Sequence, residues 1–115
     1  MAKKITIIGG GPGGYVAGIR SAQLGAEVSL IEEDNVGGTC LNRGCIPSKV
    51  MKRTAEILND FKRAQEFGIS VKGVIRPDMK ALMNRKETVI SNQTKGILKL
   101  LDRNKVRLID RKSVV

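Results

Sequence analysis

The sequence KITIIGGGPGG, residues 4–14, decides the fold class of this chain. Its β-branched first half, residues 4–8, is typical of a buried parallel strand. Residues 15–24 after the glycines have helical propensity, and the apolar run at 26–31 is predicted to be a second strand. A β-α-β unit within about thirty residues implies neighbouring parallel strands. The sequence therefore predicts an α/β fold with a parallel sheet.

Three glycines in this stretch have the spacing Gly9-x-Gly11-x-x-Gly14 between the predicted strand and helix, which indicates a Rossmann-like dinucleotide site. The first glycine permits a tight turn, the second lets the backbone approach a pyrophosphate, and the third lets helix and strand pack closely. Glu32 follows about twenty residues on, where a carboxylate binds ribose hydroxyls and disfavours a 2′-phosphate. The spacing does not separate NAD from FAD, and a glycine-rich turn without a ligand is the alternative. The predicted phosphate-binding residues are Gly9, Gly11, Pro12, Gly13 and Gly14.

Two cysteines, Cys40 and Cys45, lie in the run GGTCLNRGCIPSK at residues 37–49. A helix is predicted to begin near Cys45, and a helix N-terminus stabilises a thiolate, as does a nearby cation such as Arg43 or Lys49. Two unequal thiols suit thiol–disulfide exchange, in which one sulfur is attacked and the other leaves. A structural disulfide and a two-thiolate metal site with outside ligands are the alternatives.

The remaining pattern is mostly helical. Residues 35–44 are predicted to form a glycine-rich loop, and the helix after it is predicted to end at Gly68. A short apolar segment follows at 69–71, and Pro77 begins a second long helix with an apolar stripe. Residues 105–109 are predicted to be a third strand.

Composition excludes several kinds of chemistry. The 115 residues contain no His, so no imidazole mechanism is possible within this chain. Two Cys without His cannot form the usual zinc sites, and 3% aromatic residues make a poor platform for stacking single-stranded nucleic acid. No run approaches a membrane span and the N-terminus lacks a signal-peptide apolar region, so a cytoplasmic protein is expected.

The net charge of +10 is concentrated in the second half of the chain. Residues 1–50 carry five basic and four acidic side chains, whereas residues 51–115 carry sixteen basic and seven acidic ones. Such asymmetry can mark a nucleic-acid or anionic-membrane surface. Because the cations are scattered at helical intervals, a solvated helix face is the favoured interpretation, and a missing acidic partner domain is another.

Together, the glycine fingerprint and the cysteine run resemble the flavin-dependent pyridine nucleotide-disulfide oxidoreductases. The specific match covers residues 4–51, and TKGI at 94–97 is similar to the third helix of that family. The Leu-Asn-Arg between the cysteines favours the members that oxidise dihydrolipoyl groups over those that reduce mercuric ion or glutathione disulfide. The resemblance implies the N-terminal part of a discontinuous, Rossmann-like FAD-binding domain, with NAD as co-substrate.

The resemblance also implies a role for each motif residue. Cys40 would be the interchange thiol that meets the dihydrolipoyl substrate, and Cys45 the flavin-facing thiol, in charge-transfer contact as a thiolate. Electrons would pass through this disulfide to FAD and then as hydride to NAD⁺. The implied FAD ligands are Gly9, Gly11, Pro12, Gly13 and Gly14 at the pyrophosphate, Glu32 at the adenosine ribose, Gly38 and Thr39 near the phosphate and ribityl region, and Lys49 beside the isoalloxazine.

Residues 1–109 are expected to be the N-terminal portion of the FAD domain with its redox disulfide, and 110–115 a divergent tail or junction. The family's nicotinamide domain and its interface domain, with a His–Glu acid/base pair, would lie beyond the chain. An N-terminal fragment is therefore expected, with weak or absent FAD binding and no turnover by itself. The implied partners are a second copy, when full length, and the dihydrolipoyl carrier of a 2-oxo acid dehydrogenase or glycine cleavage complex. The alternatives are another disulfide reductase of the superfamily and a non-enzymatic nucleotide-binding module.

Overall fold

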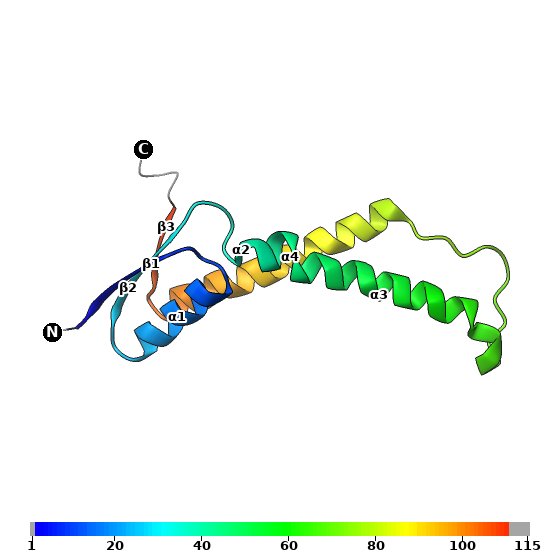
Figure 1. Cartoon of the computed structure of the whole chain (residues 1–115), viewed down its shortest axis with the longest axis horizontal. Helices are drawn as coiled ribbons and strands as arrows, with labels where there is room; N and C mark the ends of the chain where they lie inside the picture. The colour runs from blue at the N-terminus through cyan, green and yellow to red at the C-terminus, as the bar shows by residue number, and fades with distance from the viewer. Residues whose placement is uncertain (1, 111–115) are drawn as a thin grey trace.

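A computed structural model describes residues 2–110 of the chain (Figure 1). Its sheet has three parallel strands in the order β1-β2-β3, formed by Lys4–Ile8, Glu27–Glu32 and Arg107–Asp110. Ile7, Leu30 and Leu108 lie side by side across the sheet, so the three strands share one register of inward and outward positions. The predicted α/β class with a parallel sheet is confirmed.

Helices connect the strands and also extend beyond them. Because both β1–β2 and β2–β3 are parallel neighbours, each connection crosses over through a helix, first α1 and later α4. The helices are α1 (Pro12–Gln23), α2 (Gly38–Arg43), α3 (Cys45–Lys62) and α4 (Met79–Arg103), with a 3₁₀ turn η1 at Ala64–Phe67. None of the helices within residues 2–110 is both long and apolar enough to cross a membrane.

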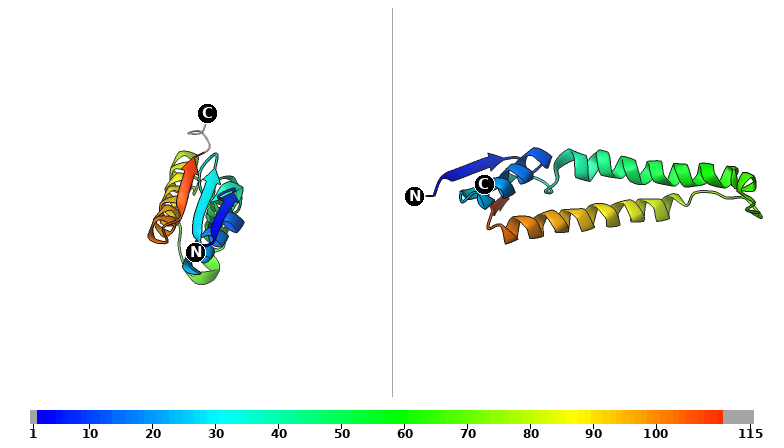
Figure 2. Two further views of the ribbon diagram at one scale, coloured as in Figure 1. Left: turned by 90° about the vertical axis from the view of Figure 1, so that its left-hand side faces the viewer. Right: turned by 90° about the horizontal axis from the view of Figure 1, so that it is seen from below.

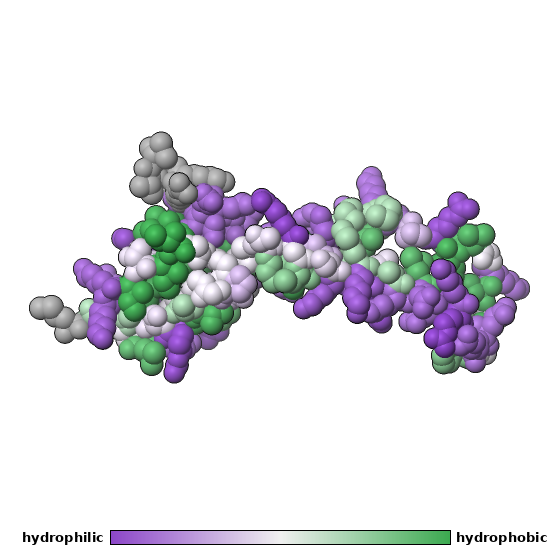
Figure 3. Space-filling view, in the orientation of Figure 1, coloured by the Kyte–Doolittle hydropathy of each residue, from purple (hydrophilic) through white to green (hydrophobic). Residues whose placement is uncertain are grey.

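The core lies between the sheet and the helices α1 and α4. Val28 and Leu30 are buried on one face of β2 and pack with Leu101 of α4 and Val106. Ile19 of α1 packs against this cluster at its border, as do Ile5, Ile7, Tyr15, Ala22, Ala26 and Ile97. The opposite sheet face is uncovered, and its apolar side chains appear over the strands in Figure 3. The site-bearing end of the molecule is therefore held by one small aliphatic core.

Two adjacent leucines of α4 test this core. Leu101 is 2% exposed inside the cluster, whereas Leu100 is 46% exposed. Leu101→Ala is expected to lower the free energy of unfolding by about 2–5 kcal/mol, because it removes buried methyl groups and leaves a cavity. Leu100→Ala is expected to cost well under half of that. Urea unfolding of both variants measures the difference, and equal losses would contradict the assigned core.

The helices α3 and α4 form a long antiparallel arm that leaves the sheet (Figures 1 and 2). The molecule measures 68 × 32 × 18 Å as a result. Hydrophilic side chains and apolar patches share the surface of the arm in Figure 3, and several of its cations pair with acids on the same helix, as Lys52 and Arg53 do with Glu56. Much of the basic second half therefore lies on the exposed surface of this arm.

Several predicted boundaries differ from the structure. The loop expected at residues 35–44 is wrong in part, because α2 forms within it, capped by Gly37 and beginning at Gly38, both with left-handed backbone conformations. Gly68 ends the short 3₁₀ turn rather than α3, which ends at Lys62. The third strand extends to Asp110, and residues 111–115 of the expected tail lie outside the described residues.

Candidate functional site

The phosphate loop connects β1 to α1 and requires two of its glycines for steric reasons. Gly9 has a left-handed φ of +99°, which favours a residue without Cβ, and its N–H donates to the carbonyl oxygen of Ile31 at 2.8 Å. A Cβ on Gly14 would overlap the carbonyl oxygen of Gly9 and approach the side chain of Ile7. The third glycine therefore permits the close packing of helix on strand that the motif predicts.

The N-terminus of α1 is open toward an anion. Pro12 occupies the first turn, Gly11 precedes it without any side-chain cap, and the first turn contains no acidic residue. Within residues 2–110, the N–H groups of Gly13 and Gly14 have no hydrogen-bond acceptor. Free N–H groups and the positive end of a helix dipole together suit a phosphate. This loop has the features that a dinucleotide pyrophosphate needs.

Glu32 lies at the carboxyl end of β2 and reaches back to the phosphate loop. Its Oε2 accepts the N–H of Gly10 at 2.6 Å, and its Oε1 accepts the N–H groups of Glu33 and Asp34 at 2.8 and 2.9 Å. Partial burial raises the pKa of Glu32, but these three backbone hydrogen bonds together hold the pKa below its ordinary value. A carboxylate offers about four lone-pair positions, and three are used by these backbone N–H groups. The Glu32 carboxylate can therefore accept about one further hydrogen bond, such as one from a hydroxyl.

This hydrogen bonding predicts a pH dependence. A depressed folded-state pKa contributes stability above the unfolded pKa of about 4.3, and that stability is lost as pH falls through the folded pKa. Glu32→Gln is therefore expected to destabilise the chain most at neutral pH, with the gap to wild type narrowing below about pH 4. Urea unfolding at several pH values measures it. Glu27→Gln on the same strand is the control, since its carboxylate is exposed and 4.0 Å from Lys4.

The turn that leads to the cysteines packs directly on the phosphate loop. The N–H of Gly37 donates to the carbonyl oxygen of Gly10 at 2.8 Å. A Cβ on Gly38 would lie 2.8 Å from the Cα of Gly11, so only glycine fits this approach. Gly38, Thr39 and Glu32 line one polar hollow of about 260 Å³ between β2 and α2, completed by Glu33, Asp34, Asn35, Asn42 and Arg43. The structure thus brings together three of the predicted cofactor-binding residues.

The two cysteines are not bonded to each other in this structure and lie at the junction of two helices. Cys40 lies within α2, and the exposed Cys45 is the first residue of α3, as its predicted helix start required. A hydrogen bond with the side chain of Cys45 raises the pKa of the Cys40 thiol, and burial and the Cys45 charge act in the same direction. Cys40 therefore holds its proton at neutral pH beside its neighbour.

Of the two cations proposed to act on the thiols, Lys49 acts on the thiol of Cys40. The positive charge of Lys49, one turn along α3, acts to lower the pKa of Cys40, against the hydrogen bond that raises it. The guanidinium of Arg43 instead pairs with Asp34 at 2.7 Å. The effect of Arg43 on a thiolate stays a prediction, and the acidic turn after β2 holds its guanidinium in this structure. Asp34 carried no motif signal, so its role could not be found in the sequence.

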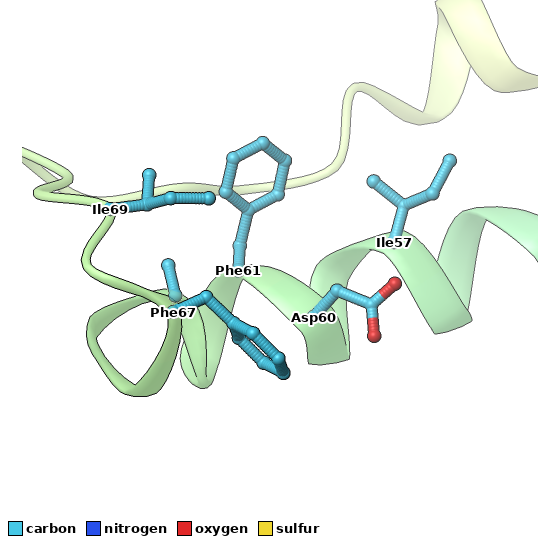
Figure 4. A pocket seen from close by; sticks show the side chains of 6 residues that line it. Ile57, Asp60, Phe61, Phe67 and Ile69 are labelled. Atoms are coloured by element: carbon cyan, nitrogen blue, oxygen red, sulfur yellow. The ribbon is translucent and has the colours of Figure 1, made fainter.

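An apolar hollow lies elsewhere, at the far end of the arm (Figure 4). It has a volume of about 470 Å³ and contains none of the predicted site residues. Its walls are Ile57, Asp60, Phe61, Ala64, Phe67 and Ile69. Within residues 2–110, no group of three or more Cys, Asp or Glu side chains is arranged to hold a metal ion. The candidate site is therefore at the carboxyl ends of the strands. It consists of the phosphate loop and of the turn from Gly37 to Cys45, which we call the cysteine turn.

Fold and site together define a dinucleotide-binding α/β unit that carries a dithiol. The family profile described as pyridine nucleotide-disulphide oxidoreductase matches residues 3–115, and the chain belongs to that family. It is 46% identical over 103 residues to a dihydrolipoyl dehydrogenase of Acholeplasma laidlawii, covering 90% of this chain and 31% of the relative. A dihydrolipoyl dehydrogenase of Chlamydia muridarum is 48% identical over 100 residues, with 87% and 21% covered.

A solved structure shows the same arrangement. The crystal structure of LpdA from Mycobacterium tuberculosis superposes with a TM-score of 0.81 at 26% identity, covering 95% of this chain and 23% of that one. This match confirms the fold class of the chain, including its parallel sheet and helices. The chain spans about a fifth to a third of the length of the curated relatives given above.

Proposed function

We propose that this chain carries the FAD-binding loop and the redox disulfide of a dihydrolipoyl dehydrogenase. The observation that supports the proposal most strongly is the contact between its two motifs. The cysteine turn bonds to the phosphate loop through Gly37 and Gly10, so a dithiol and a dinucleotide cradle form one structural unit. Family membership and the dihydrolipoyl dehydrogenases among its relatives support the same function.

The residues present fit the pyrophosphate end of FAD. The open first turn of α1 and the cradle that a Cβ would fill at Gly14 would hold the phosphates. Glu32 would hold the adenosine ribose, and Gly38 and Thr39 would line the phosphate and ribityl region. When bound, FAD supplies a two-electron acceptor that returns the reduced cysteines to a disulfide and passes a hydride to NAD⁺. Lys49 would approach the isoalloxazine from α3.

In the proposed reaction the oxidised Cys40–Cys45 pair accepts two electrons from the substrate. One thiolate of the dihydrolipoyl group attacks the sulfur of Cys40, a mixed disulfide forms, and Cys45 leaves as a thiolate. The second dihydrolipoyl thiol then attacks the substrate sulfur that is bonded to Cys40. The lipoyl disulfide forms, and Cys40 is released. One proton from the substrate returns to Cys40, whose raised pKa favours the thiol form, and the other goes to solvent.

A comparison of substrates tests the proposal. Full-length, FAD-loaded protein is expected to reduce NAD⁺ with dihydrolipoamide and to show little activity on glutathione disulfide or Hg(II). Activity on either of the last two, with none on dihydrolipoamide, would replace the proposal with a different disulfide reductase of the superfamily.

The proposed partners are a second copy of the full-length protein and the lipoyl carrier of a 2-oxo acid dehydrogenase or glycine cleavage complex. A cytoplasmic location stays a prediction.

A further inference from the structure

Asn42 stands between the two cysteines and joins α2 to the chain before it. Its Nδ2 lies 2.9 Å from the carbonyl oxygen of Gly38, 3.3 Å from that of Asn35 and 3.4 Å from that of Val36. A side-chain amide nitrogen has only two hydrogens, so the three carbonyl oxygens share them. The side chain is half-buried and donates to backbone on both sides of Gly37. One amide thus holds the turn from β2 to α2 closed.

The turn that Asn42 closes is the one that contacts the phosphate loop. Gly37, between two of the carbonyls that Asn42 holds, is buried and donates its N–H to the carbonyl oxygen of Gly10 at 2.8 Å. Gly38 lies so close to Gly11 that a side chain could not be placed between them. Any movement of the turn would therefore move the contact with the dinucleotide cradle.

On its other side, Asn42 leads directly to the second cysteine. Gly44 lies two residues on. Its carbonyl oxygen accepts hydrogen bonds from the Ser48 hydroxyl at 2.6 Å and from the Ser48 N–H at 3.1 Å. These bonds fix the first turn of α3, in which Cys45 stands. A Cβ on Gly44 would lie 3.1 Å from the carbonyl oxygen of Thr39, so the end of α2 and the start of α3 are closely packed. The positions of Cys40 and Cys45 thus depend on how α2 is held.

From this arrangement we infer that Asn42 is a positioning residue that keeps the cysteine turn in register with the phosphate loop. The inference rests on the proposed function, in which both act on one bound cofactor. Its physical content is that one side-chain amide determines the Gly37–Gly10 hydrogen bond and the contact between the two thiols. Asn42 acts through these groups, and no direct contact with a substrate or cofactor is assigned to it.

The experiment compares Asn42→Leu and Asn42→Asp with Asn59→Leu and Asn59→Asp in the full chain, without added nucleotide. Asn59 is exposed on α3 and takes part in none of the described side-chain hydrogen bonds. Its variants therefore make the same changes of shape and charge as the Asn42 variants, without loss of a described hydrogen bond. Three quantities are measured. The first is the exchange rate of the Gly37 amide hydrogen. The second is the pH midpoint for alkylation of Cys40, which peptide mapping follows, and the third is the equilibrium constant of the Cys40–Cys45 couple in a thiol–disulfide buffer.

In Asn42→Leu, the Gly37 amide is expected to exchange about tenfold faster, because its hydrogen bond to Gly10 opens more often. The alkylation midpoint of Cys40 is expected to fall, because the thiol loses the Cys45 hydrogen bond that raises its pKa. The couple is expected to shift toward the dithiol by about tenfold, because separated thiols close a disulfide less readily. Asn42→Asp is expected to give the faster exchange and the same shift of the couple, and the Asn59 variants are expected to match wild type.

Wild-type values for all three quantities in Asn42→Leu would overturn the inference, and so would a change confined either to the Gly37 amide or to the thiols. If that variant does not fold, Asn42→Gln is used, since it keeps the donor but displaces it by one methylene. It is expected to shift all three readouts in the same directions by less. A wild-type chain that forms no Cys40–Cys45 disulfide would overturn the proposed function and this inference together. A wild-type disulfide with unaffected Asn42 variants would overturn the inference alone.

Discussion

Gly14→Ala is expected to destabilise the chain by about 3 kcal/mol and to weaken dinucleotide binding by about a hundredfold or more. The added Cβ would overlap the carbonyl oxygen of Gly9, a backbone atom that cannot rotate away. Relief of this overlap requires α1 to move off β1, which opens the close packing that the third glycine provides. The free N–H groups of the first turn then no longer face the position of the phosphates.

Gly13→Ala is the matched control for this change. A Cβ at Gly13 meets nothing within 4 Å, and the residue lies in the first turn of α1. Replacing glycine by alanine in a helix is expected to stabilise the chain by about 0.5–1 kcal/mol, so the two neighbouring substitutions have opposite signs. Urea unfolding measures the stabilities. Two variants of equal stability would contradict the assigned packing of α1 on β1.

Cys45→Ser is expected to abolish both disulfide formation and dihydrolipoyl oxidation while leaving the fold intact. Cys45 is exposed, so its replacement removes little buried contact, but no second sulfur is then available to release Cys40. Mass analysis after mild oxidation should find no internal disulfide in the variant. In full-length, FAD-loaded protein, the long-wavelength absorbance that appears on two-electron reduction should also be absent.

Cys40→Ser separates the two sulfur roles. It also loses the disulfide, but it keeps the thiol at the start of α3, which the proposal places next to the flavin. The variant is therefore expected to be inactive toward dihydrolipoamide and to bind nucleotide as wild type does. Retention of the long-wavelength band in Cys45→Ser, with its loss in Cys40→Ser, would reverse the roles proposed for the two cysteines.

Local signals in the sequence were sufficient for the phosphate loop and its strand. The β-branched run, the glycine spacing and the acid at Glu32 each require only neighbouring residues or one β-α-β unit, and the structure places them as expected. α1 begins at Pro12, a few residues earlier than its apolar pattern indicates, because proline suits a first helical turn. The start of α3 at Cys45 was also predicted from local residue preferences.

Features that depend on tertiary contacts were missed. The helix α2 begins at two consecutive glycines with positive φ, Gly37 as its N-cap and Gly38 as its first residue, a pattern that the sequence alone does not distinguish from a loop. Its closure by the Asn42 amide, and the capture of Arg43 by Asp34, both join segments that are separate in sequence. The long arm was also unexpected, since the apolar stripes of α3 and α4 do not indicate that these helices leave the sheet.

We propose that the Cys40–Cys45 pair and a bound FAD form one electron path, held together by the contact between the cysteine turn and the phosphate loop. Anaerobic titration of full-length, FAD-loaded protein with a two-electron reductant tests it most directly. Two pairs of electrons are expected to be taken up for each flavin, and the first pair is expected to produce two alkylatable thiols at Cys40 and Cys45. Uptake of a single pair, with both cysteines unchanged, would contradict it.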